Sequence, residues 1–282
     1  YSGFGSNATQ ASGITATLHD GAGTIVDGLG GTDTVGNIEQ VNGSQLADTI
    51  TITGSQGMVV LGNDGADVIH GGDGADDIDG GSGADTIDGG GGNDILRGVS
   101  GHTNGVGVLD SFTGGAGSDT FVIDPSVLSG FAVADVVTDF QGGAGGDVVD
   151  LSNVVTYLVG AGEITAGQNP FATGNLRLVA GSAVVQVDWD GADGPKGWAD
   201  LVILQGTTPG ALVAENFAGY DPGTGGPVPI PPGFSFSNFS ANSSGAPIGP
   251  TTTQGVSTSI ANGSFMIEAT GVWKSMKKVL PG

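Results

Sequence analysis

A nine-residue period dominates residues 62–97 and limits the folds open to this chain. These residues divide into four consecutive units, GNDGADVIH, GGDGADDID, GGSGADTID and GGGGNDILR. Glycine opens each unit, and a large aliphatic residue holds the eighth place. The fourth-place glycines are Gly65, Gly74, Gly83 and Gly92, and the sixth-place aspartates are Asp67, Asp76, Asp85 and Asp94. After residues 98–104 the period resumes in residues 105–113, with Asp110, and in residues 114–122, with Asp119. Collagen is excluded because its glycine period is three.

The spacing predicts a loop of six residues followed by a strand of three. Glycines allow the tight loop conformations, and only the middle strand residue points inward because side chains alternate along a strand. Two units then make one turn of a flattened, right-handed parallel coil. Ile69 should stack on Ile87 along one wall, and Ile78 on Leu96 along the other. The expected fold class is all-β, with a parallel β-roll.

The acidic residues indicate a metal as the counter-charge. The net charge is −23, and all but four of the 29 acidic residues are Asp, whose short side chain suits compact oxygen cages. Stacking brings Asp67 near Asp85 and Asp76 near Asp94. We expect Asp64 and Asp73, at the third place of their loops, to contribute as well. Loop carbonyls would complete about six oxygen ligands, which Ca²⁺ prefers and the tighter Mg²⁺ octahedron does not. The expected cofactor is Ca²⁺.

The pattern GGxGxDxUx resembles the RTX (repeats-in-toxin) calcium-binding repeat. The competing interpretation is a set of Asp-Gly turns in an ordinary sandwich, which six near-regular units disfavour. Residues 123–220 resemble the β-rich C-terminal cap of RTX proteins exported by type I secretion systems. The matching motifs are Asn169-Pro170-Phe171, Val185-Gln186-Val187-Asp188 and Asn216-Phe217. This resemblance implies that the cap nucleates folding of the roll and lies near the export signal.

Four segments are expected along the chain. Residues 1–60 should form degenerate roll coils, residues 61–122 the calcium-binding roll, residues 123–220 the cap, and residues 221–282 a linker and extended tail. Strand candidates cover 175–180, 183–190 and 199–206 in the cap, and SFSNFS and SFMIEATGVW in the tail. Further metal ligands are expected at Asp48, Asp139, Asp147 and Asp150, and an extra metal site at Asp188, Asp190 and Asp193. The alternative for the last three is an acidic hairpin turn.

No catalytic motif accompanies these repeats, so we expect no enzymatic activity. HExxH and GxSxG are missing. The RTX resemblance implies a secreted or cell-surface protein, and metal binding can stabilise such a protein without disulfides. The absence of a long apolar run and of net positive charge leads us to expect that it neither enters membranes nor binds nucleic acid. The chain opens at Tyr1, which suggests a fragment of a longer protein.

Three functions fit such a chain. The first is a structural or adhesive protein of a surface layer, filament or adhesin, whose tail (222–282) adds a strand to a neighbouring copy; the competing interpretation is a tail folded back on its own cap. The second is a secretion and stability module of a larger enzyme or toxin. The third is an ice- or sugar-binding solenoid, for which the row Thr49, Thr51 and Thr53 is too short on its own.

Overall fold

The computed structural model describes residues 11–99, 109–124, 134–191 and 197–223, together with three strands between residues 257 and 277. The chain divides into two compact units, residues 1–224 and 225–282. Each unit is described by itself.

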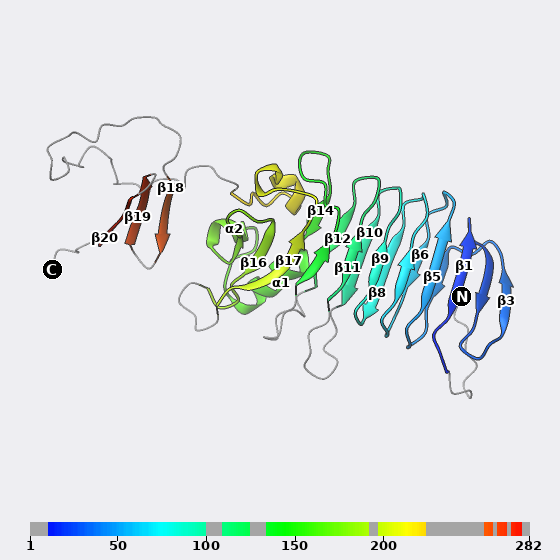
Figure 1. Ribbon diagram of the computed structural model, residues 1–282. Helices are drawn as coiled ribbons and strands as arrows, with labels where there is room; N and C mark the ends of the chain where they lie inside the picture. Colours follow the sequence, from blue (N-terminus) through cyan, green and yellow to red (C-terminus); the bar gives the residue numbers. More distant parts are fainter. Residues whose placement is uncertain are drawn as a thin grey trace. The chain divides into compact units, whose positions relative to one another are not determined.

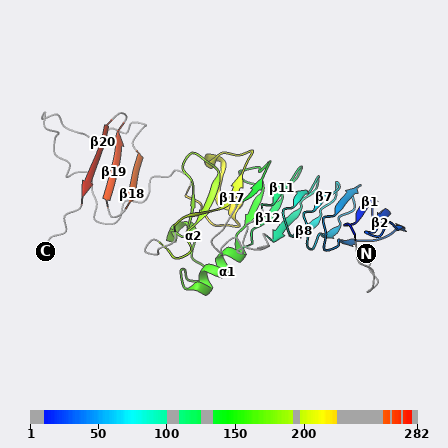
Figure 2. The same cartoon turned by 60° about the horizontal axis from the view of Figure 1, so that its bottom comes forward.

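The first unit is a parallel β-roll with two walls (Figures 1 and 2). One wall contains β5 (Thr49–Thr53), β7 (Val68–His70), β9 (Thr86–Asp88), β11 (Ser111–Thr113) and β13 (Asp135–Val137). The other contains β4 (Gln40–Asn42), β6 (Val59–Leu61), β8 (Asp77–Ser82), β10 (Ile95–Val99), β12 (Thr120–Val122) and β14 (Val148–Asp150). Because consecutive strands alternate between the walls, two repeat units make one coil, as the period predicts.

The strand register confirms the predicted core. Ile69 pairs with Ile87 on one wall, and Ile78 pairs with Leu96 on the other. In β7, β9 and β12 the middle residue is buried, while its neighbours are exposed or half-buried. The core is therefore one side chain thick per wall, and it becomes aromatic toward the C-terminal coils, where the rings of Phe112, Phe121 and Phe140 contact in sequence.

The N-terminal strands differ from the expectation of further roll coils. β1 (Thr15–His19), β2 (Ala22–Val26) and β3 (Thr32–Val35) form an antiparallel meander, and β1 joins it to the roll by pairing in parallel with β5. The connection between β1 and β2 is too short for a coil, because Asp20 and Gly21 turn the chain at once with positive φ angles. Parallel strands need a long crossover connection, so strands joined by such a short turn, like β1 and β2, pair as an antiparallel hairpin.

The roll extends further than the repeat predicts. β13 and β14 lie in residues 123–220, yet they pair in parallel with β11 and β12 and add one more strand to each wall. The sequence conceals this coil because its two loops are longer and depart from the nine-residue period. Beyond it, β17 (Ala199–Leu204) pairs in parallel with β13, and β16 (Val184–Val187) and β15 (Leu176–Leu178) follow in antiparallel order. The three strand candidates of the cap therefore do form strands.

Helices after the roll were not expected from the sequence. α1 (Ser152–Ala161) buries Val154 and Leu158, and it ends at Gly162 in the left-handed conformation. α2 (Pro170–Thr173) begins at Asn169, whose side chain accepts a hydrogen bond from the Phe171 amide. The short turns η2 (Pro209–Ala211) and η3 (Ala214–Phe217) follow β17. Valine-rich sequence concealed α1, because β-branched residues have low helix propensity.

The second unit contains a three-stranded antiparallel sheet, where the sequence predicts an extended tail. Its strands are β18 (Ser257–Ala261), β19 (Ser264–Ala269) and β20 (Val272–Lys277), in that order across the sheet. The candidate SFMIEATGVW corresponds to β19 and the start of β20. The candidate SFSNFS, residues 235–240, lies outside the described residues.

Candidate metal centre

Each wall of the roll contains a ladder of buried aspartates. The backbone N–H of one aspartate donates to Oδ1 of the aspartate in the next coil of the same wall. On the first wall the ladder runs through Asp48, Asp67, Asp85, Asp110 and Asp135, with N···Oδ1 distances of 2.7, 2.8, 2.9 and 3.0 Å. On the second wall it runs through Asp76, Asp94, Asp119 and Asp147, with distances of 2.8, 2.9 and 3.0 Å. The predicted neighbours Asp67–Asp85 and Asp76–Asp94 thus lie in adjacent coils.

The second carboxylate oxygen of these aspartates is buried and largely unpartnered. Oδ2 has no hydrogen-bond partner in Asp67, Asp85, Asp94, Asp110 and Asp119. All five side chains are buried. A buried anionic oxygen without a partner is costly unless a cation or a proton compensates it. The ladder therefore has five oxygens whose chemistry calls for a bound cation.

Glycine at the first and fourth places is required by this packing. A Cβ at Gly80 would overlap Oδ2 of Asp85, its own sixth-place aspartate, and Gly62, Gly89 and Gly114 meet theirs in the same way. At the fourth place, Gly83 has a φ of 151°, and its Cβ would overlap the carbonyl oxygen of Gly65. Loops of successive coils therefore stack backbone on backbone, with the carbonyls of one loop beneath the glycines of the next.

Burial raises the pKa of the ladder carboxyls. The pKa of Asp110 rises to about 8 because the side chain is desolvated and the charge of Asp135 is close. Desolvation raises the pKa of Asp67 to about 7, that of Asp94 to about 7 and that of Asp85 to about 6. Neighbouring aspartates add to the effect in all three. A divalent cation would reverse these shifts by favouring the ionised form.

The available ligand atoms suit calcium better than they suit a metal that is bound by side chains alone. Among the described residues, no group of three or more acidic, histidine or cysteine side chains is placed to hold a metal. The ligands beyond one or two Asp oxygens would have to be loop carbonyls, and the stacked glycine loops supply them. Calcium accepts such mixed carboxylate and carbonyl oxygen shells with flexible geometry.

The ends of the ladders are closed by protein groups. Oδ2 of Asp48 accepts from the Ser44 amide at 2.6 Å, and Oδ2 of Asp147 accepts from the Gln141 amide at 2.7 Å. Oδ2 of Asp76 accepts from the Gly72 amide at 2.9 Å. The Oδ2 atoms that are free to bind a cation are thus concentrated in the middle coils.

Several predicted ligands lie outside the ladders. Asp64 and Asp73 are exposed on the loop surface. Oδ1 of Asp150 accepts from the Ser152 amide at the start of α1, at 2.8 Å. Asp139 binds the amides of Gly114 and Gly115 at 2.9 and 2.8 Å. The structure does not bring these four carboxylates into the two rows, because their positions in the loops point them at solvent or at backbone amides.

Asp135 belongs to the ladder but was missed by the sequence reasoning. Its neighbour in the ladder, Asp110, precedes it by 25 residues, as Asp85 precedes Asp110. The available signal was the tetrapeptide Ala134-Asp135-Val136-Val137, which repeats the Ala-Asp-x-aliphatic end of the regular units.

The extra acidic group of the cap is described only in part, because Asp193 lies outside the described residues. Asp188 is 5% exposed, and burial raises its pKa, with the charges of Asp190 and Glu163 adding to the rise. Its role as a metal ligand stays a prediction.

The segment after β17 contacts the last loop of the roll through one buried side chain, that of Asn216 in η3. The amide of Asn216 donates from Nδ2 to the carbonyls of Asp147, at 2.7 Å, and Gly143, at 3.1 Å. Its Oδ1 accepts from the amides of Gly143, at 2.9 Å, and Val213, at 3.0 Å. The Asn216-Phe217 pair of the sequence motif therefore fixes loop 141–147, where the second ladder ends.

Parallel walls, stacked glycine loops and two buried aspartate ladders define a calcium-binding roll protein. Residues 59–102 match the family model of the RTX calcium-binding nonapeptide repeat in four copies. The chain contains RTX calcium-binding repeats, and these repeats bind Ca²⁺. The repeat is a structural module, and proteins that contain it are typically secreted.

No curated protein matches the chain. Within the described residues, none of the helices has the length and apolar character needed to cross a bilayer.

Proposed function

We propose that this chain is an extracellular module that folds on binding calcium after export by a type I secretion system, and that it has a structural or adhesive role rather than a catalytic one. The observation that carries the proposal is the set of five buried, unpartnered Oδ2 atoms in the ladders. These oxygens make the folded roll dependent on a cation, so calcium concentration can decide whether the chain folds.

The coupling follows from the opposing free energies. Without calcium, burial of the carboxylates and their mutual repulsion oppose folding, and a core of one side chain per strand cannot offset the loss of chain entropy. Extracellular calcium sites have dissociation constants of about 10⁻⁴ to 10⁻³ M, so millimolar calcium outside a cell would fill them. Binding to the folded state alone then contributes directly to folding free energy. The chain would stay unfolded during export and fold outside.

Calcium titration into EDTA-treated protein tests this proposal. We expect circular dichroism to show a cooperative gain of β-structure, and size-exclusion chromatography to show compaction in the same calcium range. A chain that is already folded in EDTA and unchanged by calcium would refute the proposal.

The cap, residues 123–220, supports export by a type I secretion system. Its resemblance to the caps of exported RTX proteins lies in the motifs around Asn169, Val185 and Asn216, and the Asn216 side chain makes three hydrogen bonds to the last coil. A cap that is fixed to one end of the roll can serve as a template on which coils add in sequence.

The structural role is supported by the second unit. β18 and β20 are the outer strands of a three-stranded sheet. Outer strands can pair with a strand from another chain. The alternative, a secretion and stability module for an activity encoded upstream, needs no assembly.

Deletion of residues 222–282 distinguishes these two functions. If the tail joins copies, the full chain should form large species with calcium, and the deleted chain should remain monomeric with the same calcium midpoint. Equal assembly of both chains would contradict tail-mediated joining, and absence of assembly in both would favour the module.

A further inference from the structure

Two rows of threonine side chains, interrupted only by Val26, lie on the outer face of β3, β2, β1 and β5. These four strands are neighbours in the larger sheet, although they come from residues 15 to 53 in a different order (Figures 1 and 2). The strand register aligns the first row as Thr32, Val26, Thr15 and Thr49, and the second as Thr34, Thr24, Thr17 and Thr51. All are exposed except Thr51, which is half-buried.

The first row continues along the roll. From Thr49 it passes through Val68, Thr86, Ser111 and Val136, so that eight strands in succession carry only Thr, Val or Ser at this position. The second row changes character after Thr51, where His70 and Asp88 form an ion pair at 3.5 Å. The uncharged two-row array is therefore confined to β3, β2, β1 and β5.

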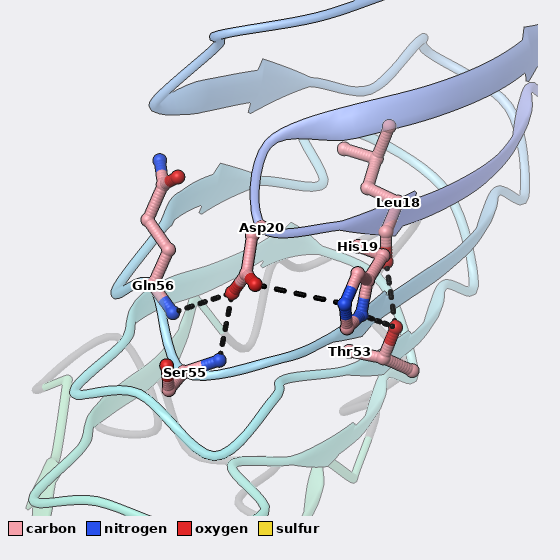
Figure 3. A network of polar contacts seen from close by, with 6 residues as sticks. All are labelled: Leu18, His19, Asp20, Thr53, Ser55 and Gln56. Carbon is pink, nitrogen blue, oxygen red and sulfur yellow. Dashed lines mark hydrogen bonds and ion pairs between the residues drawn. The ribbon is translucent and has the colours of Figure 1, made fainter.

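A polar network borders this array at the end of β1. Nδ1 of His19 lies 3.1 Å from the Thr53 hydroxyl, which also donates to the Leu18 carbonyl. Asp20 contacts His19 at 3.6 Å and accepts from the Ser55 and Gln56 amides (Figure 3). Thr53 thus has protein partners, whereas the structure shows no protein hydrogen bond for the hydroxyls of the seven threonines in the two rows, all of which are described residues.

The two outer faces of the roll differ in a way that strand propensity does not explain. The outer face of the other sheet mixes apolar side chains with charged ones, including Asp77 and Arg97, which pair at 2.7 Å. β-Branched residues suit both faces equally well. In a chain with net charge −23, two adjacent rows without a charged side chain across four strands are a distinct surface.

The geometry of the array selects its ligand. Neighbouring strands lie about 4.8 Å apart, and residues two apart on one strand lie about 6.7 Å apart, so hydroxyl and methyl groups repeat in two dimensions. A complementary ligand needs a rigid, uncharged net of hydrogen-bonding groups. A sugar surface would call for aromatic side chains, and these eight positions contain none.

We propose that this threonine array binds the surface of ice crystals, whose water molecules form such a net. The sequence row Thr49, Thr51 and Thr53 is too short for this purpose, but the antiparallel meander places Thr15, Thr17, Thr24, Thr32 and Thr34 beside it. The array rests on the folded roll and so on the proposed calcium-dependent folding.

The test is ice-crystal growth in a nanolitre osmometer, with the full chain in excess calcium. The folded protein should shape the crystals and delay their growth. Thr17→Lys, which puts a long charged side chain in the centre of the array, should abolish both effects. Val59→Lys, an exposed position of the other wall, should retain them.

Circular dichroism in calcium separates the two proposals. A variant or wild-type chain that fails to fold bears on the calcium proposal. A wild-type chain that folds but does not shape ice, or one that binds crystalline polysaccharide instead, would overturn the ice-binding assignment. Full activity of folded Thr17→Lys would overturn it as well.

Discussion

The ladder aspartates differ from surface acids because their two carboxylate oxygens have different surroundings. Oδ1 is bonded to the backbone of the preceding coil, so the side chain is fixed before any ion arrives. Oδ2 is buried and, in five of these residues, without a partner. The fixed oxygen sets the stacking of coils, and the other oxygen makes that stacking depend on a cation.

Asp85→Asn tests these separate roles of Oδ1 and Oδ2. The amide can still accept the bond from the Asp67 amide, but one anionic ligand is lost. Since a charged hydrogen-bonding group contributes about 1.5 kcal/mol or more, we expect the calcium midpoint to rise about tenfold. The matched control is Asp88→Asn, a partly exposed residue that pairs with His70 on the outer face. Calorimetric titration gives both midpoints; equal values would rule out Asp85 as a ligand.

The raised pKa values predict an unusual pH dependence. The ordinary Asp pKa is 3.8, and the folded values reach about 6 in Asp85 and about 8 in Asp110. The folded, calcium-free roll therefore holds more protons than the unfolded chain in this range, and its free energy of unfolding falls as pH rises from about 4 to about 8.

Protons stabilise the folded, calcium-free roll in this range, so the calcium concentration at the folding midpoint should be lower at about pH 5 than at about pH 8. Parallel calcium titrations followed by circular dichroism at the two pH values check the direction. A midpoint that falls as pH rises would contradict the raised pKa values of the buried carboxyls.

At the scale of elements, a buried side-chain amide in η3 closes the end of the roll. The Asn216 amide donates to two carbonyls of loop 141–147 and accepts from one of its amides. This loop ends the second ladder, so η3 and the last coil should be stabilised together.

Asn216→Ala leaves these buried backbone groups unpartnered and should reduce the free energy of unfolding in calcium by roughly 3 kcal/mol. Asn153→Ala, at an exposed position of α1, should change it little. Urea unfolding in excess calcium gives both values. If the two variants were equally stable, Asn216 would not couple the C-terminal segment to the roll.

Elements were predictable where the period held. The strands from β7 to β10 followed from spacing alone, because six loop residues and three strand residues leave one geometry. β13 and β14 did not, since their loops depart from the period while the walls continue. The helix α1 also escaped prediction, because Val154 and Val155 favour strands locally and the burial of Val154 and Leu158 depends on what packs against them.

For the whole molecule, the net charge of −23 raises the question of whether any cation could make the roll fold. Monovalent salt screens exposed charges but cannot ligate buried Oδ2 atoms, and Mg²⁺ prefers a tighter octahedron. We therefore expect folding at about tenfold lower concentration of Ca²⁺ than of Mg²⁺ at equal ionic strength, and no folding with NaCl alone. Circular dichroism titrations check this order. Equal midpoints for both divalent ions would indicate general charge neutralisation.

The sequence alone determined the repeat unit, the two-wall coil and the calcium chemistry, because these depend on contacts that recur every nine or eighteen residues. It also predicted eight of the nine ladder aspartates as metal ligands. Local spacing also explains why glycine must hold the first and fourth places.

The tertiary structure decided the rest. It placed Asp135 in the ladder, sent Asp64 and Asp73 to the surface, and brought β3, β2, β1 and β5 into one register. These outcomes depend on loop lengths and on pairing between strands distant in the chain, and no local period encodes them. The threonine array exists only through that pairing.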